Sequence, residues 1–210
     1  MARTEPFDQH RDQYEQWFVE HPQVFESELA AIRAALPRGT GIEIGVGTGL
    51  FAEKLGITDG VEPSAAMAAL ARQRGIHVCR GVAEELPYHD SSFDFALMVT
   101  AICFVDSPDK AVREMKRILR PGGTLVLAFV DRDSPLGRTY EEYKAQNVFY
   151  RDAQFYSVQD IRQVLNSAGL EVTRVSQTVF GELDEVKTVQ IAEEGFGRGG
   201  FVVISAKVLG

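Results

Sequence analysis

One twelve-residue stretch constrains the fold of this chain more than any other. It reads Gly41-Ile-Glu-Ile-Gly-Val-Gly-Thr-Gly-Leu-Phe-Ala, a short apolar run that leads directly into glycines at 45, 47 and 49. Glycine permits a tight turn and lets the backbone approach a ligand closely. A helix that opens behind such a turn offers its unpaired N–H groups to that ligand. The stretch therefore predicts a strand, a ligand-binding turn and a helix.

Two common glycine-rich motifs do not match these letters. A dinucleotide-binding G-x-G-x-x-G would need its third glycine at position 50, where the chain has Leu50. A nucleotide-triphosphate P-loop ends in Gly-Lys-Ser/Thr, and the first lysine after Gly49 is Lys54. Neither a dehydrogenase nor a P-loop enzyme is therefore expected.

Beyond this turn, short apolar runs alternate with amphipathic segments. The alternation favours an α/β fold with a parallel sheet and helices on both faces. No crossover helix is evident before the last strand, which favours an antiparallel pair at the sheet edge. Helices are expected at 8–20, where Tyr14, Trp17 and Phe18 share a face, and then up to Leu36. The expected strands are 41–45, 57–62, 77–81, 93–100, 124–131, 171–178 and 201–207. The remaining helices are expected at 49–54, 64–74, 83–86, 107–119, 137–147 and 157–168.

Composition limits the class of partner. The 210 residues are enough for one domain and short for two. The net charge of −8 and the lack of a basic run disfavour a nucleic-acid ligand. No apolar run is long enough for a bilayer, and the first residues do not resemble a secretory signal. Two cysteines without CxxC spacing predict neither a disulfide framework nor a metal site, and a cytoplasmic protein is expected.

Four motifs follow one another between residues 41 and 130. They are Glu43-Ile-Gly45-Val-Gly47-Thr-Gly49, Gly60-Val-Glu62-Pro63-Ser64, Gly81-Val-Ala83-Glu84-Glu85-Leu86-Pro87 with Phe93-Asp94, and Arg120-Pro-Gly-Gly123. In this order they resemble the class I S-adenosylmethionine (SAM)-dependent methyltransferases, most closely the type 11 group. With the flanking helices and edge strands, the resemblance covers nearly the whole chain.

The resemblance implies a Rossmann-like methyltransferase fold with a seven-stranded, mostly parallel sheet and an antiparallel edge strand. It implies one domain in three parts: an N-terminal helical lid over 1–38, a SAM-binding core over 39–135, and acceptor-side helices and edge strands over 136–210. The cofactor would be SAM and the product S-adenosylhomocysteine (SAH).

Several side chains have a physical reason to contact such a cofactor. Glu62, at a strand end beside the glycine turn, could accept hydrogen bonds from both ribose hydroxyls. Met67 could cover the adenine ring, and Glu84 could accept from its amino group. The resemblance implies that Glu43 faces the methionine end, while Thr100 would lie under the sulfonium. The predicted cofactor residues are Tyr14, Glu43, Gly45, Gly47, Thr48, Gly49, Glu62, Pro63, Met67, Ala83, Glu84 and Thr100.

The acceptor is expected beyond the fourth and fifth core strands. Many relatives carry His or other polar residues after strand four, whereas this chain reads Thr100-Ala-Ile-Cys-Phe-Val. This favours an apolar pocket, or an acceptor that needs little help in losing a proton, such as an amine or a thiol. No catalytic side chain is predicted, because a positioned sulfonium methyl needs only orientation. The predicted pocket residues are Trp17, Cys103, Phe104, Tyr140 and Tyr143.

The leading hypothesis is thus methyl transfer to a small molecule by direct in-line displacement. The alternative is a non-enzymatic SAM sensor or partner subunit, which would bind SAM without methylating an acceptor. An RNA or protein methyltransferase is disfavoured by the acidic charge. A polyamine synthase would need additional carboxylates for its amine substrate, and no such cluster is recognisable in the sequence.

Overall fold

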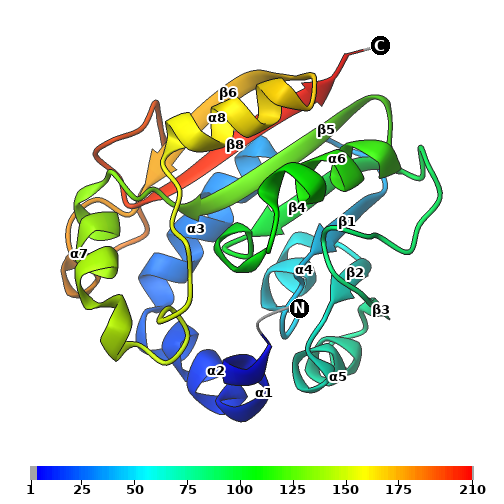
Figure 1. Cartoon of the computed structure of the whole chain (residues 1–210). Coiled ribbons are helices and arrows are strands. Elements are labelled where there is room, and N and C mark those ends of the chain that lie inside the picture. Colours follow the sequence, from blue (N-terminus) through cyan, green and yellow to red (C-terminus); the bar gives the residue numbers. More distant parts are fainter. Residues whose placement is uncertain (1–3, 210) are drawn as a thin grey trace.

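The computed structural model describes residues 4–209, which fold around one mixed β-sheet (Figure 1). Within these residues the sheet has eight strands in the order β3-β2-β1-β4-β5-β8-β6-β7. The strands are β1 (Gly41–Ile44), β2 (Asp59–Glu62), β3 (His77–Arg80), β4 (Phe93–Val99), β5 (Leu119–Val130), β6 (Leu170–Thr178), β7 (Glu193–Glu194) and β8 (Phe201–Val208). The α-helices are α1 (Glu5–Gln9), α2 (Arg11–Glu20), α3 (Pro22–Ala35), α4 (Leu50–Leu55), α5 (Ala65–Gln73), α6 (Pro108–Ile118), α7 (Pro135–Tyr143) and α8 (Val158–Ser167).

Strands β1 to β5 are parallel, and they place their carboxyl ends along one edge of the sheet. The chain first builds outward from β1 to β3 and then returns to the other side of β1 with β4 and β5. Ligands of open α/β sheets bind outside the carboxyl ends of the strands, at the point where the strand order reverses. In this chain that point lies between β1 and β4.

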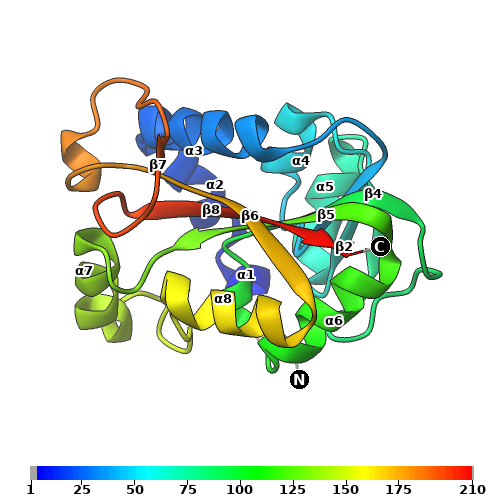
Figure 2. The same cartoon turned by 90° about the horizontal axis from the view of Figure 1, so that it is seen from above.

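Helices cover both faces of the sheet, as Figure 2 shows from above. Helices α3, α4 and α5 lie on one face, and α6 and α8 lie on the other. Because side chains alternate along a strand, β1 sends Ile42 and Ile44 into the apolar cluster beneath α6 and α8. Strand β4 sends Leu97 and Val99 into the opposite cluster with α3 and α4. The sheet is therefore buried on both faces, which explains its nearly continuous apolar strands.

Serine side chains cap the N-termini of four helices, α5, α6, α7 and α8. The Ser64 hydroxyl accepts a hydrogen bond from the Met67 N–H at the start of α5, and Ser134 does the same for Gly137 in α7. Ser157 and Asp160 form a reciprocal capping box at the start of α8. Such caps satisfy N–H groups that have no partner inside the helix.

The predicted architecture is confirmed, with an eighth strand. The final pair is antiparallel, and β8 lies between β5 and β6, while the two-residue β7 adds to β6 at the edge. Three local expectations are wrong. Residues 83–86 form a turn closed by a bridge between Val82 and Glu85 rather than a helix. The helix expected at 8–20 is broken at His10 into α1 and α2.

The expected helix at 137–147 is also divided. Helix α7 ends at Tyr143 and continues as a short 3₁₀ turn, Lys144–Gln146. Among residues 4–209, no helix combines the length and apolarity needed to cross a membrane.

Candidate active site

A cavity of about 890 Å³ opens at the carboxyl ends of the parallel strands. Its wall includes Gly45, Glu62, Thr100 and Val130, which end or directly follow β1, β2, β4 and β5. The N-terminal helices α1 and α2 close the opposite side, below the sheet in Figure 1. The volume lies near the upper end of the range for ligand pockets, so it can hold a nucleoside-sized cofactor with a small second ligand.

Two of the three glycines in the turn after β1 have different roles. Gly47 has a φ of +56°, and a β-carbon there would lie 3.6 Å from the Tyr14 hydroxyl and 3.8 Å from Met67 Cε. Such a carbon would therefore occupy the cavity. At Gly49 a β-carbon would instead meet Ala71 at 3.1 Å, so this glycine lets α5 pack close behind the turn.

Glu62 ties the end of β2 to the glycine turn. One carboxylate oxygen accepts a hydrogen bond from the Gly47 N–H at 2.9 Å, and the other accepts from the Ser64 N–H at 2.8 Å. Burial raises the pKa of Glu62, and these two N–H groups oppose the rise. The carboxylate is thus fixed in orientation at the cavity wall.

Glu84 has a structural contact that the sequence did not indicate. Its Oε1 accepts hydrogen bonds from the backbone N–H groups of Asp106 at 2.7 Å and Ser107 at 3.1 Å, at the start of α6. The side chain lines the cavity, but part of its acceptor capacity holds the two loops together. Its role toward an adenine amino group stays a prediction.

Thr100 directly follows β4 and has an unfavourable backbone conformation. Its φ is +49°, which is rare for a β-branched residue. The conformation is held by a hydrogen bond from the Thr100 N–H to the Ala128 carbonyl at 2.7 Å, and the Thr100 carbonyl accepts from Cys103 Sγ at 3.1 Å. Strain of this kind is concentrated at functional sites.

Polar contacts hold the N-terminal helices over the cavity. The Ser64 hydroxyl donates to the Asp8 carboxylate at 2.5 Å, which joins α1 to the start of α5. Arg74 pairs with Glu15 of α2 at 2.5 Å and also donates to the Thr48 carbonyl at 2.7 Å. In this arrangement the Tyr14 hydroxyl lies next to the glycine turn, 3.6 Å from the position of a β-carbon added at Gly47.

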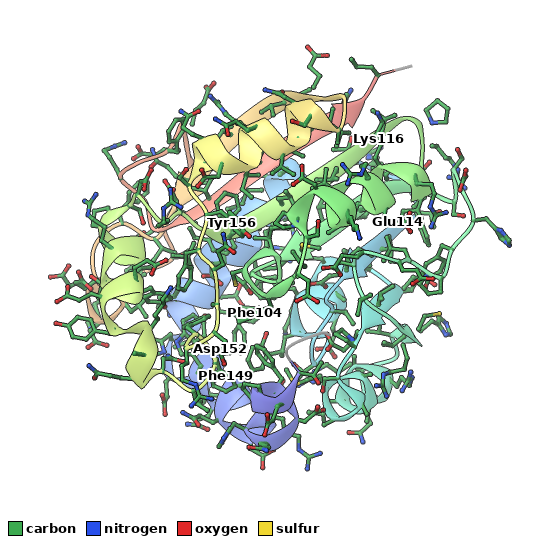
Figure 3. All side chains as sticks on the ribbon, in the orientation of Figure 1. Phe104, Glu114, Lys116, Phe149, Asp152 and Tyr156 are labelled. Carbon is green, nitrogen blue, oxygen red and sulfur yellow. The ribbon has the colours of Figure 1, made fainter. Side chains whose placement is uncertain are left out.

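Aromatic rings form much of the remaining cavity wall. Phe7 of α1 contacts Phe104 edge-on at 5.0 Å between ring centroids and Phe149 at 5.4 Å. Tyr150 stacks on Phe104 at 6.2 Å and lies 5.3 Å from Tyr140. Figure 3 shows Phe104 and Phe149 between the N-terminal helices and the end of the sheet.

Most of the predicted site residues line this one cavity. They are Tyr14, Trp17, Gly45, Gly47, Glu62, Pro63, Met67, Ala83, Glu84, Thr100, Phe104, Tyr140 and Tyr143. Four predicted residues lie behind its wall instead: Glu43, Thr48, Gly49 and Cys103. Cys103 packs with Ala153 and Phe155 in a small separate cluster.

Glu43 is enclosed rather than exposed to the cavity. Only 1% of its surface is accessible, and one carboxyl oxygen has no hydrogen-bond partner. Burial raises the pKa of Glu43 well above its usual range, although the Ala52 N–H opposes the rise. Burial and the neighbouring Glu43 and Glu62 carboxyl groups together raise the pKa of Tyr14.

The sequence interpretation missed several wall residues, among them Glu28, Phe7, Phe149 and Tyr150. Glu28 carried a usable signal, because it lies on the same helical stripe as Phe25, Leu29 and Ile32, where an apolar residue is expected. The rings after residue 146 had no such signal, because they lie in an irregular segment that only the tertiary structure brings to the cavity.

These features fit SAM. The Gly47 backbone leaves open space where a ligand can lie against the turn, and the fixed Glu62 carboxylate offers acceptors for hydroxyl groups. Met67 and the apolar walls suit a purine ring. Among residues 4–209, no three His, Cys, Asp or Glu side chains are grouped as ligands of a metal ion.

Comparison with known proteins identifies the family. The methyltransferase domain family matches residues 42–127. A crystal structure from Thermotoga maritima, described as a SAM-dependent methyltransferase and possible histamine N-methyltransferase, is 48% identical with a TM-score of 0.96 and covers 98% of this chain and 99% of that one. This chain belongs to the SAM-dependent methyltransferases. It is therefore an enzyme that uses SAM as its cofactor.

Other similarities of this methyltransferase are less informative about its reaction. An uncharacterised protein of Methanocaldococcus jannaschii is 42% identical over 201 residues, 96% of this chain and 98% of that protein. An uncharacterised Mycobacterium tuberculosis protein is 36% identical over 191 residues, and the alignment covers 66% of its length. A putative methyltransferase of Haloferax volcanii, solved with a methyltransferase activator, has a TM-score of 0.73 at 19% identity over 100% of this chain and 99% of that one, which shows the fold alone.

Proposed function

We propose that this methyltransferase acts on a small-molecule acceptor by direct in-line displacement. The observation that carries the proposal is the continuity of the cavity. The same cavity is lined by Gly45 and Gly47 of the glycine turn and by the aromatic residues Phe104 and Tyr140. A cofactor on the glycine turn and an acceptor between the rings would share it without an intervening barrier.

Bound SAM supplies a methyl group that is already activated by the positive sulfonium. The protein then has to orient the acceptor and exclude water. Orientation alone can contribute on the order of 7–11 kcal/mol. Phe7, Tyr14 and Trp17 of the N-terminal helices enclose the cavity from below, and Phe149 and Tyr150 enclose its side. We also propose that residues 1–38 form a lid, residues 39–135 the SAM-binding core and residues 136–210 the acceptor side.

The acceptor pocket is dominated by aromatic side chains. No histidine lines the cavity among the described residues, so the acceptor needs to lose its proton without imidazole assistance. An amine or a thiol meets this requirement. The description of the Thermotoga relative as a possible histamine N-methyltransferase supports an amine.

Thermal unfolding tests the cofactor site. A ligand at about 100 times its Kd adds roughly 2.7 kcal/mol to the free energy of unfolding, which raises the midpoint by about 5–10 °C for a protein of this size. We expect SAM and SAH to raise the midpoint and NAD to leave it unchanged. Glu62→Ala should remove the shift, whereas Glu85→Ala, at an exposed position, should retain it.

Transfer is measured with methyl-labelled SAM and separate pools of amines, thiols, phenols, a protein extract and total RNA. We expect acceptor-dependent formation of SAH with a small-molecule pool. Methylation confined to protein or RNA would refute a small-molecule acceptor, and a midpoint raised by NAD alone would refute the cofactor site.

A further inference from the structure

One acidic side chain lies among the aromatic rings of the cavity. Glu28 is on α3, only 7% of its surface is accessible, and it lines the cavity together with Tyr140 and Leu136. Its neighbours on the helix, Phe25 and Leu29, are core residues. A carboxyl group at such a position is costly to bury unless something compensates for it.

Within residues 4–209, no side chain or backbone N–H donates a hydrogen bond to the Glu28 carboxyl group. Two other buried acids differ, because Glu62 accepts from two backbone N–H groups and Asp131 also accepts from two. Burial alone raises the pKa of Glu28 to about 8. The acceptor capacity of this side chain is therefore left for a ligand.

The surroundings of Glu28 suit a positive charge. Tyr14, Tyr140 and Tyr150 are near enough for the Glu28 carboxylate to contribute to the rise in their pKa values. The faces of such rings attract cations. Trp17 lines the same cavity and adds a further aromatic surface.

Two lysines line the cavity, and neither compensates for Glu28. Lys144 pairs with Glu141 at 2.8 Å and donates to the Ala153 carbonyl. Lys110 is exposed on α6. The start of this helix contacts Glu84, which is a predicted cofactor residue. The rings of the acceptor side therefore enclose a buried acid that has no cationic partner among the described residues.

We infer that Glu28 binds a protonated amino group of the acceptor, so that this enzyme takes a small cationic amine with an apolar or aromatic body. The inference rests on the proposed function, since it assigns the acceptor class of the same cavity. An ammonium ion against a buried carboxylate forms a charge-assisted hydrogen bond, and the rings exclude water around it.

The test measures binding by calorimetry at pH 7.5 to the complex with SAH. The probes are phenethylamine, histamine and the uncharged 2-phenylethanol. The variants are Glu28→Gln, Glu28→Asp and, as a matched control, Glu26→Gln, which changes an exposed acid on the same helix. SAH binding to each variant is measured first, because it reports an intact cofactor site.

We expect the wild-type complex to bind at least one amine ten-fold or more tightly than the alcohol. Glu28→Gln should reduce that preference to less than three-fold while leaving the affinity for SAH unchanged. Glu28→Asp should restore part of the preference, and Glu26→Gln should behave as the wild type.

Three results would overturn the inference: neither amine is preferred over the alcohol, the preference survives in Glu28→Gln, or Glu26→Gln removes it equally. If the alcohol binds as tightly as the amines and Glu28→Gln weakens both, Glu28 recognises a neutral group instead. Failure of the wild type to bind SAH would be a failure of the proposed function and is detected separately.

Discussion

The Glu62 carboxylate accepts a hydrogen bond from the Gly47 N–H at 2.9 Å. The contact joins the end of β2 to the turn that follows β1, although the two residues are fifteen positions apart. Glu62 therefore fixes the backbone against which we propose that the cofactor lies, in addition to the contact that we propose between its carboxylate and the cofactor hydroxyl groups. The two motifs that stand apart in the sequence form one unit in the structure.

Gly47→Ala should separate the cost of a left-handed backbone from the cost of filling the cavity. We expect about 1–2 kcal/mol of lost stability and a SAH affinity at least ten-fold weaker. Gly75→Ala is the matched control, because Gly75 has a φ of +83° and nothing within 4 Å of the added carbon. Urea unfolding should show a similar loss for both, and calorimetry should show weaker SAH binding for Gly47→Ala alone. Equal SAH affinity in the two variants would contradict this placement of the turn.

Asp8→Asn should loosen the N-terminal helices. The change replaces a carboxylate that accepts from the Ser64 hydroxyl by a neutral amide, and charged acceptors form the stronger hydrogen bonds. We expect SAH to dissociate several-fold faster in stopped-flow experiments, with faster hydrogen exchange confined to α1 and α2. Asp12→Asn, at an exposed position of α2, should match the wild type. An unchanged dissociation rate would mean that these helices do not retain the ligand.

The stability of the ligand-free enzyme should fall with rising pH because of Glu28. Its pKa is raised from 4.5 to about 8 by burial, so between these values the folded state holds a proton that the unfolded state has lost. The free energy of unfolding therefore decreases across this interval. Glu28→Gln carries no ionisable proton, so the variant should gain a few kcal/mol over the wild type at pH 9 and little at pH 4.5.

Urea unfolding at several pH values checks this expectation. Tyr14, Tyr140 and Tyr150 stay neutral in the interval because their pKa values are raised. Glu26→Gln should follow the wild-type curve. Parallel curves for the wild type and Glu28→Gln would show that Glu28 is not desolvated in solution.

Phe104→Ala should affect the acceptor and spare the cofactor. The ring contacts Phe7 edge-on and stacks with Tyr150, and such pairs contribute about 0.5–1.5 kcal/mol each. With an acceptor found in the labelled-SAM assay, we expect kcat/KM to fall about ten-fold or more, while the Kd of SAH changes less than two-fold. Phe196→Ala, which removes a partly exposed ring outside the cavity, is the control. Unaltered acceptor turnover and affinity in Phe104→Ala would exclude Phe104 from the acceptor wall.

The sequence by itself determined the fold, and most of the residues that it assigned to the cofactor line one cavity. Glycines 45, 47 and 49 and the acid at Glu62 are local signals, since a turn, a helix start and a strand end each depend on adjacent residues. The alternation of strands and helices likewise predicted the parallel sheet. Where tertiary packing set the local conformation, prediction failed, as for the turn at 83–86 that Glu84 holds against α6.

Only the tertiary structure decided which side chains face the cavity. Glu43 and Thr48 lie within the glycine motif but behind the wall, because strand and turn geometry directs them into the protein interior. Glu28 and Phe149 are 121 positions apart in the chain, and both line the same cavity. No local pattern encodes such a meeting, because it depends on how the N-terminal helices and the segment after α7 pack against the strand ends.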